Sequence, residues 1–465
     1  MRPPHRPLWL VLAVACTAQY PAELGPTFGG DQRATAALTS MASDELPTQP
    51  LTEAGLLAAW PVAVGRVRCD LGLCLDARAA WLPDDELLVA VGIEAVVERA
   101  PATVAFALDA SGSMEGYEDV RAAAVQIGLD HLDQHDEAGL WAFTGAAVEL
   151  VPAAPVDDAL GEEVHIALAA LDGLPVVRAA TAEGTACDEG FDALRDLAPE
   201  REALAEWVEL VELSTNPELG EQLLTLVCDD GSTIDEATAE VLASLPDGTV
   251  DRASRLVLVS DLGGPSAAEA VRQAAERFVG TSVLGVTEQT DTEQAAALAT
   301  APGAHTLEAP SPAHALAQWD ARFDALLYPL AWDLDLQLSE ASRAHWTLER
   351  HVGATDADGT GANALFASRH HGVLGVVLSA AGAPDATAVP PVLELTLQTP
   401  VGDVVAGVAS RVPYRLIRTD WGEGDDEVAL AVAWRMALVD AVSAGDADRL
   451  ADLLAKRRPE VVPAP

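Results

Sequence analysis

From residue 102 to about residue 310, short apolar segments alternate with segments of helical periodicity. Strands are predicted at 103–108, 139–143, 147–151, 255–260, 282–286 and 305–307, and helices at 117–134, 158–171, 266–278 and from 294 onward. Such alternation is typical of a parallel sheet with helices on both faces. We therefore predict an α/β fold with a doubly wound, mostly parallel sheet in a domain at 101–328. Helical, acidic material at 199–252 is predicted as an insertion.

The segments on either side of this domain have different patterns. Residues 17–58 are rich in Ala, Thr, Pro and Gly and are predicted as a flexible stalk with one helix near 51–60, and 59–100 as a strand-rich segment. After 329, apolar and polar residues alternate between Gly and Pro turns, which predicts an antiparallel β domain at 329–420. A helical C-terminal segment is expected at 421–458, broken at Gly445.

The charge of the chain excludes some classes of partner. It carries 73 acidic and 27 basic side chains, a formal net charge of −46. Such a surface repels phosphate backbones and anionic lipid headgroups, so we expect no nucleic-acid binding and no direct membrane binding through side chains. The same charge attracts cations.

The first 16 residues are typical of an export signal. Arg2 and Arg6 precede a short apolar run at 8–15, which ends at Cys16. Residues 13–16 resemble a lipobox, so lipidation of Cys16 is predicted, with simple cleavage as the alternative. We expect an exported protein, lipid-anchored to the outer membrane or cell envelope, or otherwise periplasmic or secreted.

Four further cysteines, an even number, suit an oxidising compartment. Cys69 and Cys74 are close enough to close a small loop, which leaves Cys187 and Cys228 to close a long one. A zinc site is the alternative, but the sequence lacks the tight Cys-x-x-Cys spacing of such sites.

Oxygen-bearing side chains follow two of the predicted strands. Asp109, Ser111 and Ser113 follow the strand at 103–108, and Asp261 comes directly after the strand at 255–260. Thr185 lies in a loop that opens a helix. In open parallel sheets, ligands bind beyond the carboxyl ends of the strands. Carboxylate and hydroxyl oxygens suit Mg²⁺, or alternatively Mn²⁺ or Ca²⁺. The weaker alternative is an Asp and two serines that merely cap a strand-to-helix turn.

Asp109-x-Ser111-x-Ser113 resembles the metal-ion-dependent adhesion site of von Willebrand factor type A domains, with the resemblance covering about 100–310 without the insertion. It implies that Ser111 and Ser113 bind the metal directly. Thr185 would bind directly or through water, and Asp109 and Asp261 mostly through water. The chain has Ser260-Asp261-Leu262 where the family has Thr-Asp-Gly. The layout also resembles bacterial exported type A proteins with a C-terminal β-rich domain.

These features predict a non-enzymatic protein that binds a divalent cation and, through it, an Asp or Glu side chain of a protein partner. The alternative is a structural or assembly component of the envelope, in which the metal only stabilises the fold. An enzyme is not expected, because no recognised motif places a base or nucleophile beside these residues. His131 and His135 lack the glutamate of a His-Glu-x-x-His motif and are interpreted as surface residues.

Overall fold

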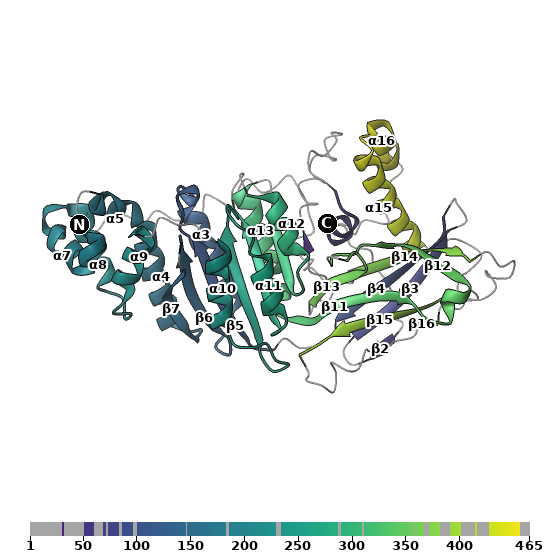
Figure 1. Cartoon of the computed structure of the whole chain (residues 1–465), viewed down its shortest axis with the longest axis horizontal. Helices are drawn as coiled ribbons and strands as arrows, with labels where there is room; N and C mark the ends of the chain where they lie inside the picture. Colours follow the sequence, from purple (N-terminus) through teal and green to yellow (C-terminus); the bar gives the residue numbers. More distant parts are fainter. Residues whose placement is uncertain are drawn as a thin grey trace, which may run out of the picture.

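The computed structural model describes residues 30–31, 51–59, 68–70, 73–82, 86–95, 100–145, 147–182, 186–228, 234–286, 290–308, 311–356, 358–366, 372–381, 391–400, 414–415 and 427–455. The molecule is elongated, with a helical bundle at one end, an α/β sheet in the middle and a β sandwich at the other end (Figure 1).

A seven-stranded sheet forms the middle of the molecule. Its strand order is β1-β10-β9-β8-β5-β6-β7, and every neighbouring pair is parallel except β6 and β7. The strands are β1 (Gly30–Asp31), β5 (Ala102–Asp109), β6 (Glu137–Phe143), β7 (Ala147–Pro155), β8 (Ala253–Ser260), β9 (Val279–Gly285) and β10 (Ala304–Glu308). Without β1, this is the doubly wound order in which the chain runs outward from β5 in both directions.

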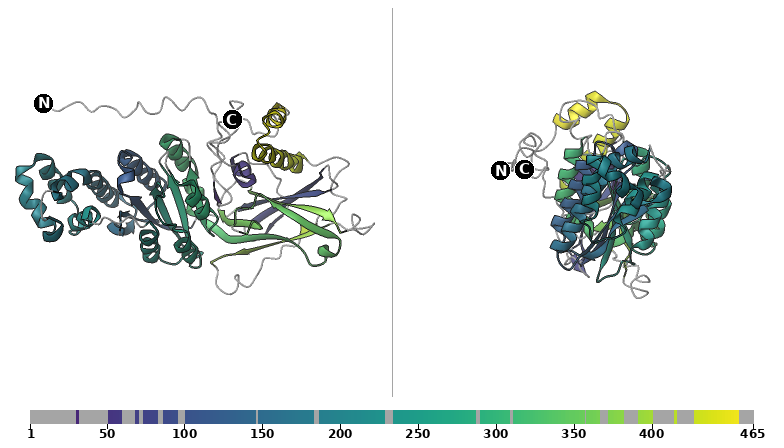
Figure 2. Two further views of the ribbon diagram at one scale, coloured as in Figure 1. Left: turned by 45° about the horizontal axis from the view of Figure 1, so that its top comes forward. Right: turned by 90° about the vertical axis from the view of Figure 1, so that its left-hand side faces the viewer.

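Helices cover both faces of this sheet, which explains why its central strands are buried throughout. In β5, Val104, Phe106 and Leu108 belong to one apolar core, and Ala105 and Ala107 to another. The first core is completed by α3 (Glu118–His131), α4 (Asp158–Asp172) and α13 (Pro312–Leu327), and the second by α10 (Ile234–Ser244), α11 (Ala268–Ala275) and α12 (Thr292–Ala299). The predicted doubly wound, mostly parallel α/β fold is confirmed; Figure 2 shows the two helical layers.

Additional helices form a bundle beyond the β7 edge (Figure 1). They are α5 (Leu174–Thr181), α6 (Ala186–Glu189), α7 (Phe191–Leu197), α8 (Glu202–Val211) and α9 (Leu219–Cys228). The indole Nε1 of Trp207 donates to the Ala170 carbonyl oxygen at 2.8 Å, which joins α8 to α4. The bundle thus begins with α5 and ends with α9, earlier at both ends than the insertion expected at 199–252. The helix α10, which falls within that expected range, packs on the sheet itself.

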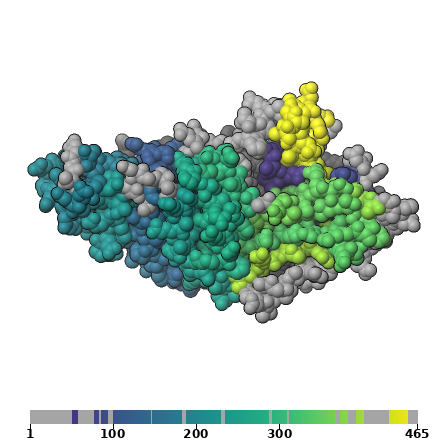
Figure 3. All heavy atoms as spheres, viewed as in Figure 1, coloured from purple at the N-terminus to yellow at the C-terminus, as the bar shows by residue number. Residues whose placement is uncertain are grey.

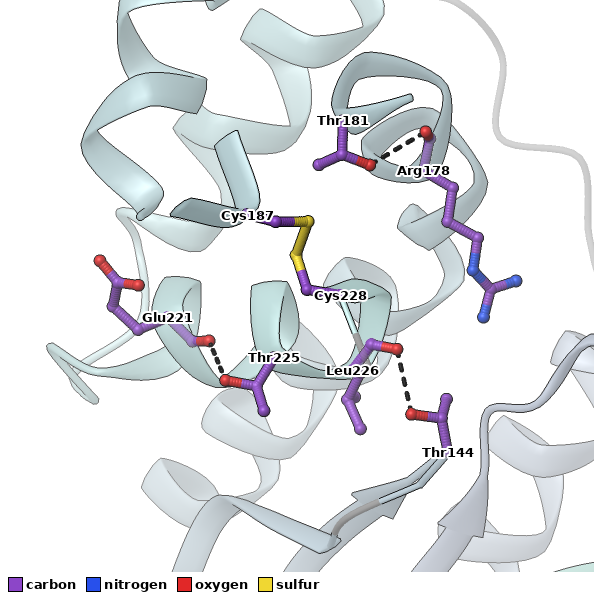
Figure 4. The surroundings of a disulfide bond; sticks show 8 residues. All are labelled: Thr144, Arg178, Thr181, Cys187, Glu221, Thr225, Leu226 and Cys228. Atoms are coloured by element: carbon purple, nitrogen blue, oxygen red, sulfur yellow. Dashed lines mark hydrogen bonds between the residues drawn. A yellow bond between two sulfur atoms is a disulfide. The ribbon is translucent and has the colours of Figure 1, made fainter. Parts of the chain in front are cut away.

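A disulfide between Cys187 and Cys228 closes 41 residues of this bundle (Figure 4). The predicted pairing of these two cysteines is confirmed. Close to it, the Thr144 hydroxyl donates to the Leu226 carbonyl oxygen at 3.0 Å, which joins α9 to the segment that follows β6. This hydrogen bond ties the bundle to the carboxyl edge of the sheet, and the disulfide joins two helices within the bundle.

Two antiparallel sheets form the β sandwich. One has the order β13-β11-β15-β16 and the other β12-β14-β4-β3-β2. Their strands are β2 (Arg68–Asp70), β3 (Leu73–Trp81), β4 (Leu87–Ala95), β11 (Pro329–Leu338), β12 (Trp346–Val352), β13 (Gly361–Phe366), β14 (Gly372–Ala380), β15 (Val392–Gln398) and β16 (Tyr414–Arg415). The strand-rich segment at 59–100 and the β domain at 329–420, expected as separate units, are one unit, because β4 pairs with β14 and both sheets share one core.

Two helices lie against this sandwich, and a third packs on one of them. Residues of α2 (Glu53–Ala59) and α15 (Glu427–Ser443) pack on β4, β12 and β14, and α16 (Ala447–Ala455) packs on α15. Gly445 has φ 65° between α15 and α16, at the predicted break. Figure 3 shows α16 projecting from the side of the molecule. Among the described residues, no single helix meets the length and apolarity needed to cross a membrane, although the bent pair α4 and α5 does so jointly.

The α/β sheet and the sandwich meet at Asn363 of β13. Its Nδ2 lies 2.6 Å, 2.9 Å and 2.9 Å from the carbonyl oxygens of Ala299, Ala301 and Ala304. Its own carbonyl oxygen accepts from the Gly303 backbone N–H at 3.0 Å. Asn363 is fully buried, so these bonds replace solvent for the end of α12 and the start of β10.

We expect Asn363→Ala to lower the free energy of unfolding by about 2 kcal/mol, because buried carbonyl oxygens lose their donor. Asn363→Asp should cost more, since a carboxylate oxygen would then face those carbonyl oxygens. Thermal unfolding of both variants measures this, with falls of roughly 2–4 °C for each kcal/mol. Equal midpoints for Asp and Asn at this position would contradict the account.

Candidate metal centre

The loop after β5 brings together three of the predicted ligands. Asp109 is 3% exposed, and its Oδ1 accepts from the Ser111 backbone N–H at 2.9 Å. This bond turns the chain so that the Ser111 and Ser113 hydroxyl oxygens lie 2.9 Å apart. Ser113 lies in the short 3-10 helix Gly112–Met114, whose last residue, Met114, is buried. Two hydroxyl oxygens and a carboxylate thus face the carboxyl edge of the sheet from one short turn.

The end of β8 lies beside this loop, because β5 and β8 are parallel neighbours with Leu108 opposite Val259. The Ser260 hydroxyl donates to Asp109 Oδ2 at 2.7 Å and accepts from the Leu262 backbone N–H at 2.9 Å. Asp261 is 6% exposed, and its Oδ1 accepts from the Gly263 backbone N–H at 2.9 Å. The second predicted carboxylate is therefore held at the same edge.

Burial raises the pKa of the Asp109 carboxyl above its ordinary value. Hydrogen bonds from Ser111 and Ser260 oppose this shift in pKa, and the nearby Asp261 carboxylate adds to it. A buried carboxylate whose charge is disfavoured by burial, a second buried carboxylate and two adjacent hydroxyls are a donor set that suits a hard divalent cation. The residues present therefore fit the predicted metal.

Two arginines support the same loop through its main chain. Arg121 Nη1 donates to the Asp109 carbonyl oxygen at 2.7 Å, and Arg178 Nη2 donates to the Ala110 carbonyl oxygen at 2.8 Å. Burial lowers the pKa of Arg121, and the guanidinium lies 3.8 Å from the Asp172 carboxylate. Burial also raises the pKa of Asp172 to about 6. Neither arginine was among the predicted site residues, since helical residues carry no local signal of a contact with a distant loop.

Of the predicted site residues, the structure places Asp109, Ser111, Ser113 and Asp261 at one edge of the sheet. Thr185 and Cys16 lie outside the described residues. Cys69 of β2 lies directly opposite Cys74 of β3 in the strand register, and their side chains lie outside the described part, so their disulfide stays a prediction. Ser260 was noted only as a departure from the family pattern, but it contacts Asp109 directly.

A second threonine deserves comparison with Thr185. Gly231-Ser232-Thr233 precedes α10 in the sequence, outside the described residues. The first residue of α10, Ile234, is 1% exposed and shares a core with Phe143, which pairs with Asp109 in the sheet. By contrast, the helix after Thr185 is α6, which packs in the bundle. Thr233 is therefore a further candidate ligand. Its signal in the sequence is a Gly and a Thr just before the helix that precedes β8.

No protein-family model matches the chain, and no curated protein matches it. Solved structures similar to it include a von Willebrand factor type A protein from Catenulispora acidiphila, at 12% identity and TM-score 0.45, covering 83% of this chain and 86% of that one. Another is VWA2, the ArnB paralog from Sulfolobus acidocaldarius, at 11% identity and TM-score 0.41, covering 84% and 92%. At these values the likeness carries no argument about function, and the fold assignment rests on the strand order.

Asp109→Asn should raise the thermal midpoint at neutral pH in chelator, because it removes a buried charge. The folded carboxyl binds a proton more readily than the unfolded one, so its effect on stability worsens as pH rises through its raised pKa. The gain should therefore shrink as pH falls through that pKa. Calorimetry over a pH series measures this, with Asp188→Asn as an exposed control. A gain that is independent of pH would contradict this cause.

Thr185→Ala and Thr233→Ala form a matched pair. Loss of a ligand oxygen should weaken Mg²⁺ binding about tenfold, close to the value of one hydrogen bond to a charged group. We expect the larger loss for Thr233→Ala, because α10 begins beside the sheet edge. Calorimetric titration with Mg²⁺ measures both. A larger loss for Thr185→Ala would restore the original assignment.

Proposed function

We propose that this chain is a binding protein of the von Willebrand type A kind, which holds a divalent cation and through it captures an acidic side chain of a protein partner. One observation carries the proposal: the buried carboxylates of Asp109 and Asp261 share a sheet edge with the paired hydroxyls of Ser111 and Ser113. A cation there would offset two buried negative charges.

In this proposal Ser111 and Ser113 hold the metal directly, and Asp109 and Asp261 hold it mostly through water. Mg²⁺ suits these oxygen ligands best, with Mn²⁺ and Ca²⁺ as alternatives. The bound metal would supply a positive centre for an external carboxylate. The residues of this chain would position it: Asp109 turns the serine loop, and Ser260 orients Asp109. The proposed activity is binding, not catalysis.

The net charge of −46 shapes how such a partner would approach. An acidic partner and this surface repel each other at long range, so attachment would depend on short-range contact at the metal. Salt screens that repulsion over about 10 Å at 0.1 M ionic strength. Moderate salt is therefore expected to speed association, the reverse of steering by opposite charges.

We also propose that the protein is exported and anchored to the cell envelope through lipid on Cys16. The disulfide between Cys187 and Cys228 supports an oxidising compartment. The alternative function is an envelope component whose metal only stabilises the fold. Metal removal would then lower the thermal midpoint strongly while partner binding is retained.

Millimolar Mg²⁺ should raise the thermal midpoint of the parent protein above its value in EDTA. Saturation a hundredfold above Kd contributes about 2.7 kcal/mol. Ser111→Ala should abolish this rise and leave the far-UV spectrum unchanged, because it removes a direct ligand. Ser244→Ala, at an exposed helix end, is the matched control. An identical midpoint for the parent in EDTA and in Mg²⁺, Mn²⁺ or Ca²⁺ would reject the proposal.

A further inference from the structure

Arg121 and Arg178 contact successive carbonyl groups of the metal loop but differ in what remains of their donors. Arg121 is 5% exposed, and its two terminal nitrogens are engaged by the Asp109 carbonyl and by the Asp172 carboxylate. Arg178 is half-buried, and among the described residues its one hydrogen-bond acceptor is the Ala110 carbonyl. Since a guanidinium has five N–H donors, most of those of Arg178 stay open to a ligand.

These open donors lie in a pocket beside a predicted metal ligand. Ser111 and Arg178 both line it, and its other lining residues are Ala110, Met114, Glu115, Glu118, Arg121, Leu171, Asp172, Leu174 and Pro175. The Arg178 side chain projects from α5, the first helix of the added bundle (Figure 4). The backbone of that helix is anchored by its buried residues Leu174, Val177 and Ala180.

We propose that Arg178 is a specificity residue, which binds the second oxygen of the partner's carboxylate while the first oxygen binds the metal beside Ser111. This inference rests on the proposed function and adds a contact to it. A planar guanidinium presents parallel N–H donors that match the two oxygens of a carboxylate. The metal accepts one oxygen and leaves the other to be satisfied.

The charges of the pocket make this contact important. Glu115, Glu118 and Asp172 line the same pocket, so an approaching carboxylate meets negative charge as well as the metal. Arg121 is already paired with Asp172. Arg178 is therefore the cation in this pocket that is placed to offset the repulsion, and its loss should weaken carboxylate binding more than loss of a remote arginine.

The test uses the full chain loaded with saturating Mn²⁺, with acetate as the probe. Water bound to Mn²⁺ speeds the relaxation of water protons, so acetate that displaces this water lowers the relaxation rate. Sodium chloride keeps the ionic strength constant during the titration. The variants are Arg178→Gln, Arg178→Lys and, as a control that removes the same charge from an exposed site on α11, Arg272→Gln.

For Arg178→Gln we expect acetate affinity about tenfold below the parent, the loss typical of a charge-assisted hydrogen bond. Arg178→Lys keeps the charge without the two-point geometry and should fall between the two, and Arg272→Gln should match the parent. Because Mn²⁺ is saturating, a small change in metal affinity leaves this readout intact. If Arg178→Gln fails to take up Mn²⁺, Arg178→Lys decides the result.

Acetate affinities equal to the parent in Arg178→Gln and Arg178→Lys would overturn the role of Arg178 and leave the metal site standing. An equal fall in Arg272→Gln would also overturn it, because general charge would then explain the effect. A parent protein that binds no Mn²⁺, or binds Mn²⁺ but does not respond to acetate, would reject the proposed function itself together with this inference.

Discussion

The hydrogen bond from the Ser260 hydroxyl to the Asp109 carboxylate joins the ends of two central strands. It places a carboxylate that is 3% exposed beside that of Asp261, at an edge where water is largely excluded. A buried charge of this kind is costly unless something compensates for it, and here neutral donors do so only in part, since the pKa of Asp109 stays raised. The proposed cation would compensate for the buried negative charge at this edge.

The bundle α5–α9 changes the surroundings of that edge. The carbonyl of Ala110, between Asp109 and Ser111, accepts from Arg178 of α5, and the segment after β6 contacts α9 through Thr144. The disulfide between Cys187 and Cys228 joins α6 to α9, the last helix of the bundle. The bundle therefore contacts the loop after β5 and the segment after β6, at the carboxyl edge of the sheet.

The sandwich is joined to the sheet by buried hydrogen bonds and by an aromatic contact. Asn363 binds three carbonyl oxygens at the end of α12 and the start of β10, and Phe278 packs edge-on against Trp332 at 5.1 Å between ring centroids. Both contacts lie between the α/β part and the sandwich.

Local pattern was enough to predict much of this protein. The apolar strand at 103–108 and its Asp-x-Ser-x-Ser ending predicted both the sheet and the serine loop, since strand burial and a tight turn depend on neighbouring residues. The pairing of Cys187 with Cys228 followed from the short spacing of the other two cysteines. The disulfide in the structure agrees with it.

Contacts between distant segments were decided only by the tertiary structure. β4 and β14 pair although nearly 280 residues separate them. The N-terminal strands, expected from the sequence as a separate unit, are therefore part of the same sandwich as the C-terminal strands. Likewise, Ser260 contacts Asp109 from β8, and Arg178 contacts the neighbouring Ala110 from α5. Neither a strand's partner nor the target of a long side chain is encoded in local periodicity, because both depend on which surfaces remain to be buried once the whole chain has folded.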